Sequence, residues 1–200
     1  MSNLPANTGS NIGLLGGSFD PPHLGHSLLA LSFLALEPID ELWIIPCQNH
    51  AFKGCLNSFE QRFDMCKLAF SRINNIRVLD LENSIDPPNY TIKTLDLILS
   101  KRPDLNLFFA IGSDLITDFS KWHKPEEILK KTSVVIFERQ NYPIKLTPIL
   151  KNARIHQGYC LPDTNSTEIR ASILRDSSTH TFVDQKVREY INQNKLYRAF

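Results

Sequence analysis

The chain has 200 residues, of which 42% are hydrophobic and 22% charged, a composition ordinary for a folded globular protein. Its formal net charge at pH 7 is +1, so no overall positive field would attract nucleic acid or an anionic membrane, and any phosphate binding must be local. The length predicts a single domain, expected over residues 11–200 after a flexible segment at 1–10, with a C-terminal helical part at 164–200.

Short apolar runs alternate with amphipathic stretches along the whole chain. In chain order they predict strand 12–16, helix 24–36, strand 41–46, helix 59–71, strand 76–81, helix 91–100, strand 105–112, helix 125–131, strand 132–137, strand 154–156, helix 167–175 and helix 184–194. Segments 83–89 and 141–151 are predicted to be loops. The pattern indicates an α/β fold, a Rossmann-like doubly wound parallel sheet, in which ligands bind beyond the carboxyl ends of the strands.

The N-terminus and the cysteines favour a cytoplasmic protein. Residues 1–10 are polar and lack the apolar segment of a signal peptide, and no apolar run approaches the roughly 20 residues of a membrane helix. The four cysteines form no CxxC pair, which favours reduced thiols. A zinc site at Cys47, His50 and Cys55 is a minor alternative, because this spacing matches no standard zinc motif.

The most informative stretch follows the first predicted strand and reads GGSFDPPHLGH, from Gly16 to His26. Glycines let the backbone approach a ligand closely, and the start of a helix offers unpaired N–H groups and a positive dipole end. His23 and His26 are three residues apart, so their rings share one face of the helix that begins here. The stretch therefore predicts a phosphate site. A metal site is less favoured because no third ligand is evident.

GGSFDPPHLGH resembles the signature of the nucleotidylyltransferase superfamily, a glycine-rich turn followed by HxGH. With the segments that follow, the chain is similar to the nicotinate-mononucleotide adenylyltransferases of bacterial NAD biosynthesis. The resemblance implies the nucleotidylyltransferase fold, with His23 and His26 on the ATP phosphates, stabilising charge at the α-phosphorus. Contacts to ATP are also implied for the residues of the turn, Gly16, Gly17, Ser18 and Phe19.

A second phosphate motif is expected near the C-terminus. Ser166 or Thr167 can cap the helix that begins there, and Arg170, one turn on, can form a fork to phosphate oxygens. Taken alone, such a cap is structural. Its sequence resembles the family's ISSTxIR segment, which binds the β- and γ-phosphates, although Thr164 and Asn165 stand where the family usually has Ile and Ser.

A third group of residues surrounds the end of the fourth predicted strand. A carboxylate such as Asp114, after Gly112, can hold ribose hydroxyls or a magnesium-bound phosphate there, or simply cap a helix. The resemblance implies that Gly112 and Asp114 lie beside ATP, and that Trp122 packs on the pyridine ring with His123 next to it. Its charged neighbours predict that Trp122 lies at the surface. Thr91 matches a contact to the nicotinate carboxylate, or caps a helix.

The loop after the second predicted strand departs from the family. The family often has Pro-His-Lys or Pro-His-Arg here, whereas Phe52 replaces the His and His50 lies upstream. Lys53 fits the basic position and could neutralise charge on a phosphate. The departure leaves open how nicotinate and nicotinamide acceptors are told apart. Arg139 aligns with a family basic residue near ATP, but is equally explained as a solvated arginine.

The expected reaction is adenylyl transfer from ATP to nicotinate mononucleotide, with release of pyrophosphate. Catalysis would then consist of positioning and charge stabilisation by His23, His26 and Arg170. Mg²⁺ would be held mainly by the ATP phosphates, without a protein metal site. Expected partners are ATP and the acceptor, with a homodimer as an option and neither nucleic acid nor membrane.

Two alternatives remain from the sequence. One is a related transferase that uses nicotinamide mononucleotide, phosphopantetheine or another phosphate acceptor. The other is a non-catalytic nucleotide-binding module on the same fold. A dinucleotide-dependent oxidoreductase is disfavoured because GxGxxG is missing after the first predicted strand.

Overall fold

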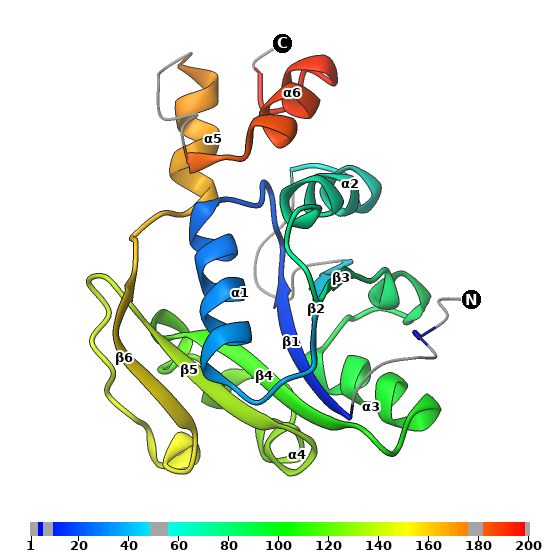
Figure 1. Cartoon of the computed structure of the whole chain (residues 1–200), viewed down its shortest axis with the longest axis vertical. Coiled ribbons are helices and arrows are strands. Elements are labelled where there is room, and N and C mark those ends of the chain that lie inside the picture. The colour runs from blue at the N-terminus through cyan, green and yellow to red at the C-terminus, as the bar shows by residue number, and fades with distance from the viewer. Residues whose placement is uncertain (1–3, 6–9, 49–55, 176–181, 199–200) are drawn as a thin grey trace.

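The computed structural model describes residues 4–5, 10–48, 56–175 and 182–198 (Figure 1). Most of the predicted N-terminal segment, residues 1–3 and 6–9, therefore lies outside the described residues, and its separation from a domain at 11–200 stays a prediction. Among the described residues, every helix is too short or too polar to cross a membrane.

Six parallel strands form one sheet in the order β3-β2-β1-β4-β5-β6. Their bounds are β1 (Asn11–Gly17), β2 (Glu41–Pro46), β3 (Ile76–Val78), β4 (Asn106–Gly112), β5 (Ser133–Arg139) and β6 (Arg154–Leu161). The chain builds outward from β1 to β3, then crosses back to β4 on the other side of β1. This is the Rossmann order, and its switch point lies between β1 and β4. The predicted α/β fold class is confirmed.

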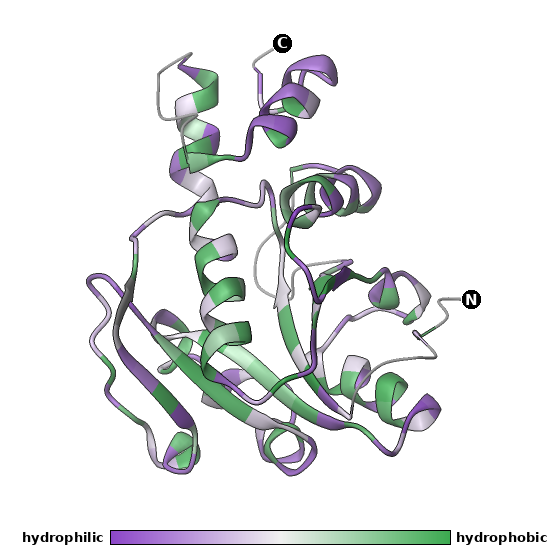
Figure 2. Ribbon diagram, in the orientation of Figure 1, coloured by the Kyte–Doolittle hydropathy of each residue, from purple (hydrophilic) through white to green (hydrophobic). Residues whose placement is uncertain are grey.

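Helices cover both faces of this sheet. The α-helices are α1 (Leu24–Leu36), α2 (Phe59–Phe70), α3 (Thr91–Lys101), α4 (Pro125–Lys131), α5 (Ser166–Leu174) and α6 (Gln185–Gln193). Successive strand residues point to opposite faces, so Phe108 packs with α1 and α2 while Phe109 packs with α3 and α4. Figure 2 shows the resulting concentration of apolar residues on the central strands and on α1.

A third apolar cluster joins the C-terminal helices to α2. It consists of Met65, Ile169, Ile173, Val183, Val187, Ile191 and Leu196. In Figure 1, α5 continues upward from the N-terminal end of α1, and α6 lies between α5 and α2. The C-terminal part is thereby held above the carboxyl end of β1.

The predicted strands are wrong at the two edges of the sheet. Residues 79–81 do not continue β3, because the chain turns into a 3-10 helix, η1 (Leu81–Ser84), that places Leu81 in the core. The same turn occupies the start of the predicted loop 83–89. β6 is longer than predicted. It is an edge strand that needs only one covered face, so its sequence is mostly polar and contains no apolar run from which its length could be predicted. The predicted loop 141–151 contains another short 3-10 helix, η4 (Pro148–Leu150).

Candidate active site

Two helix N-termini meet beyond the carboxyl end of β1. α1 begins after the glycine turn, and α5 is held against that same turn by two hydrogen bonds. Ser166 Oγ donates to the carbonyl of Pro21 over 3.0 Å, and Arg170 Nη1 donates to the carbonyl of Asp20 over 2.8 Å. The two predicted phosphate motifs, 140 residues or more apart in sequence, thus form one surface rich in backbone N–H groups.

The two histidines stand together at the start of α1. His23 is the N-cap residue, and the centroids of the His23 and His26 rings are 3.8 Å apart. His26 Nδ1 accepts a hydrogen bond from the backbone N–H of His23 over 3.2 Å. A neutral His26 therefore carries its proton on Nε2 and can donate it to a ligand.

Both imidazoles are neutral at pH 7. Burial, and then the charge of Arg139, lower the pKa of His23 to about 3. The pKa of His26 is lowered well below 6.5 by burial first, and then by His23 and Arg139. Each ring therefore acts as a hydrogen-bond donor through one N–H rather than as a cation.

The motif glycine Gly25 leaves the space that the His23 ring occupies. A Cβ on Gly25 would lie 3.1 Å from both Cε1 and Nδ1 of His23. On the other side of the turn, the Phe19 ring is fully buried and lies 4.8 Å from the His26 ring. The imidazole pair therefore packs between Gly25 on one side and the ring of Phe19 on the other.

Asp114 and Arg139 form an ion pair beside this surface. Arg139 Nη1 donates to Asp114 Oδ2 over 2.7 Å, and Nη2 donates to the carbonyl of Thr164 over 3.0 Å. A Cβ on Gly112 would clash with Asp114 Oδ1 and lie 2.8 Å from Arg139 Cδ, so a side chain at this position would displace the pair. Asp114 lies inside a 3-10 helix, η2 (Ser113–Leu115), rather than capping a helix. Arg139 is not a freely solvated arginine, because its side chain is only 20% exposed and is bound by Asp114 and by the carbonyl of Thr164.

The cap of α5 differs from the prediction. Neither Ser166 nor Thr167 is the N-cap: Asn165, with extended backbone, accepts the N–H of Glu168 on its side chain over 2.9 Å. Ser166 is thereby freed to bind the glycine turn, and Thr167 Oγ1 accepts a hydrogen bond from Arg170 Nη2 over 3.2 Å. Ser166, Thr167 and Arg170 all lie in the first turn and a half of the helix.

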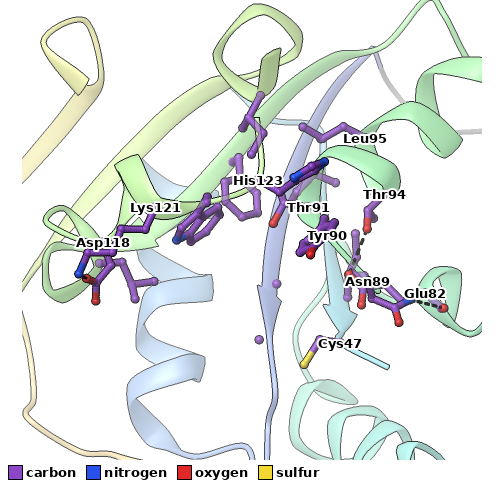
Figure 3. Close-up of a pocket in the computed structure, with 18 residues that line it drawn as sticks. Cys47, Glu82, Asn89, Tyr90, Thr91, Thr94, Leu95, Asp118, Lys121 and His123 are labelled. Atoms are coloured by element: carbon purple, nitrogen blue, oxygen red, sulfur yellow. Dashed lines mark hydrogen bonds and ion pairs between the residues drawn. The ribbon is translucent and has the colours of Figure 1, made fainter. Parts of the chain in front are cut away.

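A cavity of about 500 Å³ opens next to the glycine turn, on the side of the sheet covered by α3 and α4 (Figure 3). Its lining includes Gly16 and Gly17 of the turn together with Thr91, Trp122 and His123, three of the residues predicted to bind the acceptor. The fourth, Lys53, lies outside the described residues, as do His50, Phe52 and Cys55.

Trp122, in the wall of this cavity, is more buried than predicted. A short 3-10 helix, η3 (Phe119–Lys121), turns Trp122 inward, where its ring packs 5.1 Å from that of Phe119. His123 stacks on Tyr90, with ring centroids 4.4 Å apart. Tyr90, not Thr91, is the N-cap of α3, so the alternative role of Thr91 as a cap is wrong.

The polar end of the cavity was not predicted from the sequence. Glu82 is buried and accepts hydrogen bonds from the N–H of Gln48 and from Thr94 Oγ1, each over 3.0 Å. Asn89 Nδ2 donates to the carbonyl of Glu82 over 3.0 Å. Burial raises the pKa of Glu82. These groups join β2 to α3 around the cavity, a contact that no local pattern could reveal.

A buried arginine of α2 was also missed. The side chain of Arg62 is 1% exposed and donates to the carbonyls of Ser18, Gln48 and Asn57, over 2.8, 3.1 and 3.3 Å. It therefore fixes the glycine turn against both ends of the segment that follows β2. The one available signal was a basic residue among the apolar residues of the helix face.

Comparisons with known proteins agree with one another. Residues 14–177 match the cytidylyltransferase-like family. A protein of Anaeromyxobacter sp. (strain K), described as a probable nicotinate-nucleotide adenylyltransferase, is 32% identical over 96% of this chain and 98% of its own length. The nicotinate-nucleotide adenylyltransferase of Bacillus subtilis (strain 168) is 31% identical over 94% of this chain and 98% of its own length.

A solved structure supports the fold. The Plasmodium falciparum nicotinic acid mononucleotide adenylyltransferase complexed with NaAD superimposes with a TM-score of 0.78, at 24% identity, over 94% of this chain and 98% of that one. The likeness in backbone therefore extends over nearly the whole molecule.

Proposed function

The chain belongs to the nicotinate-nucleotide adenylyltransferases, within the cytidylyltransferase-like family, and we propose that it transfers the adenylyl group of ATP to nicotinate mononucleotide. The products are nicotinate adenine dinucleotide and pyrophosphate, in NAD biosynthesis. The observation that carries the proposal is the junction of α1 and α5, two helix N-termini facing one space beside a cavity of about 500 Å³.

The ATP phosphates are proposed to lie at this junction. N–H groups of both helices, the neutral imidazoles of His23 and His26, and the guanidinium of Arg170 would donate to phosphate oxygens. Asp114, Ser166 and Thr167 complete the ATP side. Such fixed donors, aimed at oxygens that gain charge in the transition state, are a large source of rate acceleration.

The acceptor is proposed to occupy the cavity. Trp122 offers a flat apolar surface to the pyridine ring, while Thr91 and His123 lie next to it. Lys53 is proposed to reach the acceptor phosphate. An oxygen of that phosphate attacks the α-phosphorus in line, and the bond from the α-phosphorus to the bridging oxygen of the β-phosphate breaks. The attacking oxygen is already anionic, so no general base is required.

Mg²⁺ is proposed to arrive with ATP. The described residues contain no cluster of three or more His, Cys, Asp or Glu that could hold a metal ion. Mg²⁺ commonly binds through one or two carboxylates together with substrate phosphates, and at this site Asp114 would supply a carboxylate. The ion would neutralise phosphate charge. A cytoplasmic location, a homodimer, and the lack of nucleic acid or membrane partners stay predictions.

Pyrophosphate release tests the proposal. The purified protein is incubated with ATP and Mg²⁺ in three separate reactions. Each reaction contains one acceptor: nicotinate mononucleotide, nicotinamide mononucleotide or phosphopantetheine. We expect the highest kcat/KM with nicotinate mononucleotide. Preference for the amide would reassign the acceptor, and release with none of them, despite measurable ATP binding, would indicate a binding module.

A further inference from the structure

Asp20 is a buried junction between four segments of the chain. Its carboxylate accepts hydrogen bonds from the N–H of Leu56 over 2.7 Å, from Asn57 Nδ2 over 2.8 Å and from the phenol of Tyr197 over 2.6 Å. Its backbone carbonyl accepts from Arg170 over 2.8 Å. Only 3% of the residue is exposed.

These contacts indicate that Asp20 does not itself bind substrate. Oδ1 is occupied by Asn57 and Tyr197 and Oδ2 by Leu56, so both carboxylate oxygens face protein donors. Asp20 lies in the turn between Ser18 and His23. Both of these residues belong to the proposed ATP site. A carboxylate held by several donors is a rigid anchor, and a displacement of about 1 Å in catalytic groups costs about 10²-fold in rate.

Tyr197 is the most distant of these partners in sequence, 177 residues from Asp20. The preceding residue, Leu196, is fixed in the apolar cluster shared by α2, α5 and α6. Burial, and then the charge of Asp20, raise the pKa of Tyr197 above its usual value, so the phenol keeps its proton and remains a donor. The C-terminal segment therefore supplies a permanent hydrogen bond to the glycine turn.

We propose that Tyr197 is a positioning residue for adenylyl transfer, holding through Asp20 the turn that places His23 and His26. The proposal rests on the proposed function, since it names a further residue on which the same reaction depends. It also assigns the C-terminal segment a role in the geometry of the ATP site, in addition to covering α2.

The test is Tyr197→Phe, which removes the hydroxyl and keeps the ring. We expect kcat to fall about tenfold, as for the loss of one hydrogen bond to a charged group, with KM for ATP changed less than twofold. In Asp20→Asn, Tyr197→Phe should have no further effect, because the phenol acts through that carboxylate. Tyr190→Phe is the matched control: its phenol lies 3.4 Å from Asp64, and we expect wild-type kcat.

A second readout makes the test independent of turnover. The imidazole NMR signals of His23 and His26 should shift in Tyr197→Phe and stay in place in Tyr190→Phe. If Tyr197→Phe does not fold, Asn57→Ala removes the other donor to Oδ1 and carries the same expectation. Wild-type kcat and unmoved imidazole signals in Tyr197→Phe would overturn the inference. An inactive wild type would instead overturn the proposed function, and the NMR signals would then decide the positioning role.

Discussion

Among the single residues of the site, Gly25 shows why the motif reads HxGH. The His23 ring occupies the space that a side chain at Gly25 would need. A Cβ at this position would lie only 3.1 Å from Cε1 and Nδ1 of that ring. The glycine is needed for space rather than for backbone freedom, because it lies within α1. The motif therefore encodes a side-chain arrangement that the helix pattern alone does not specify.

This predicts a separation of activity from stability in Gly25→Ala. Alanine favours a helix by about 1 kcal/mol over glycine, so the thermal midpoint should not fall much despite the local clash. Displacement of the His23 ring by a few tenths of an ångström should lower kcat, by less than the roughly 10²-fold cost of a 1 Å misplacement. Ser32→Ala, later in the same helix, is the control and should leave both values unchanged. A Gly25→Ala enzyme with normal kcat would show that the ring position is not critical.

At the scale of elements, the central part of the fold was predictable and its edges were not. β2 and α4 have the predicted bounds, because β2 is a continuous apolar run and α4 begins at a proline. β3 and β6 differ from their predicted lengths, because pairing on one side only lets an edge strand be short or polar. An apolar run alone could not tell strand from 3-10 helix at Leu81.

In the site, too, features that are local in sequence were predictable and contacts between distant segments were not. The two phosphate motifs were recognisable because each is local, a turn or cap followed by a helix. Arg62, Glu82 and Tyr197 were not, since each makes its contacts with segments distant in sequence. The roles of the predicted site residues themselves stay predictions.

α5 leads to a prediction of its own. The Arg170 guanidinium reaches the carbonyl of Asp20 and the hydroxyl of Thr167 at the same time, which the single ammonium of a lysine cannot reproduce. We expect Arg170→Lys to lower kcat/KM for ATP about 10²-fold. Arg175→Lys, exposed at the end of the same helix, should match the wild type. Equal steady-state kinetics for the two variants would remove Arg170 from the proposed ATP site.

At the scale of the whole molecule, the buried imidazoles make stability depend on pH. The unfolded chain binds a proton on His23 near pH 6.5, whereas the folded chain does so only near pH 3. Protons therefore favour the unfolded state. The stability associated with this neutral ring is fully present above pH 6.5 and is lost as the pH falls toward 3.

Urea unfolding at pH 7.5 and 5.0 measures this effect. From His23 alone, the free energy of unfolding of the wild type should drop by about 2 kcal/mol between these values, and His26 adds a drop in the same direction. His23→Asn removes one titrating group, so its loss over the same interval should be smaller. An equal loss in both proteins would contradict the low pKa of His23.

Arg62 has a consequence for how a nearly neutral protein attracts anions. Its guanidinium is buried against three carbonyl groups, one of them that of Ser18 in the turn, while Arg170 binds the carbonyl of Asp20 and Arg139 binds that of Thr164. The two histidines of the motif are neutral, so the positive charge near the turn comes from these arginines. A net charge of only +1 therefore conceals a local concentration of arginines, partly offset by the carboxylates of Asp20 and Asp114, at the place where the phosphates are proposed to lie.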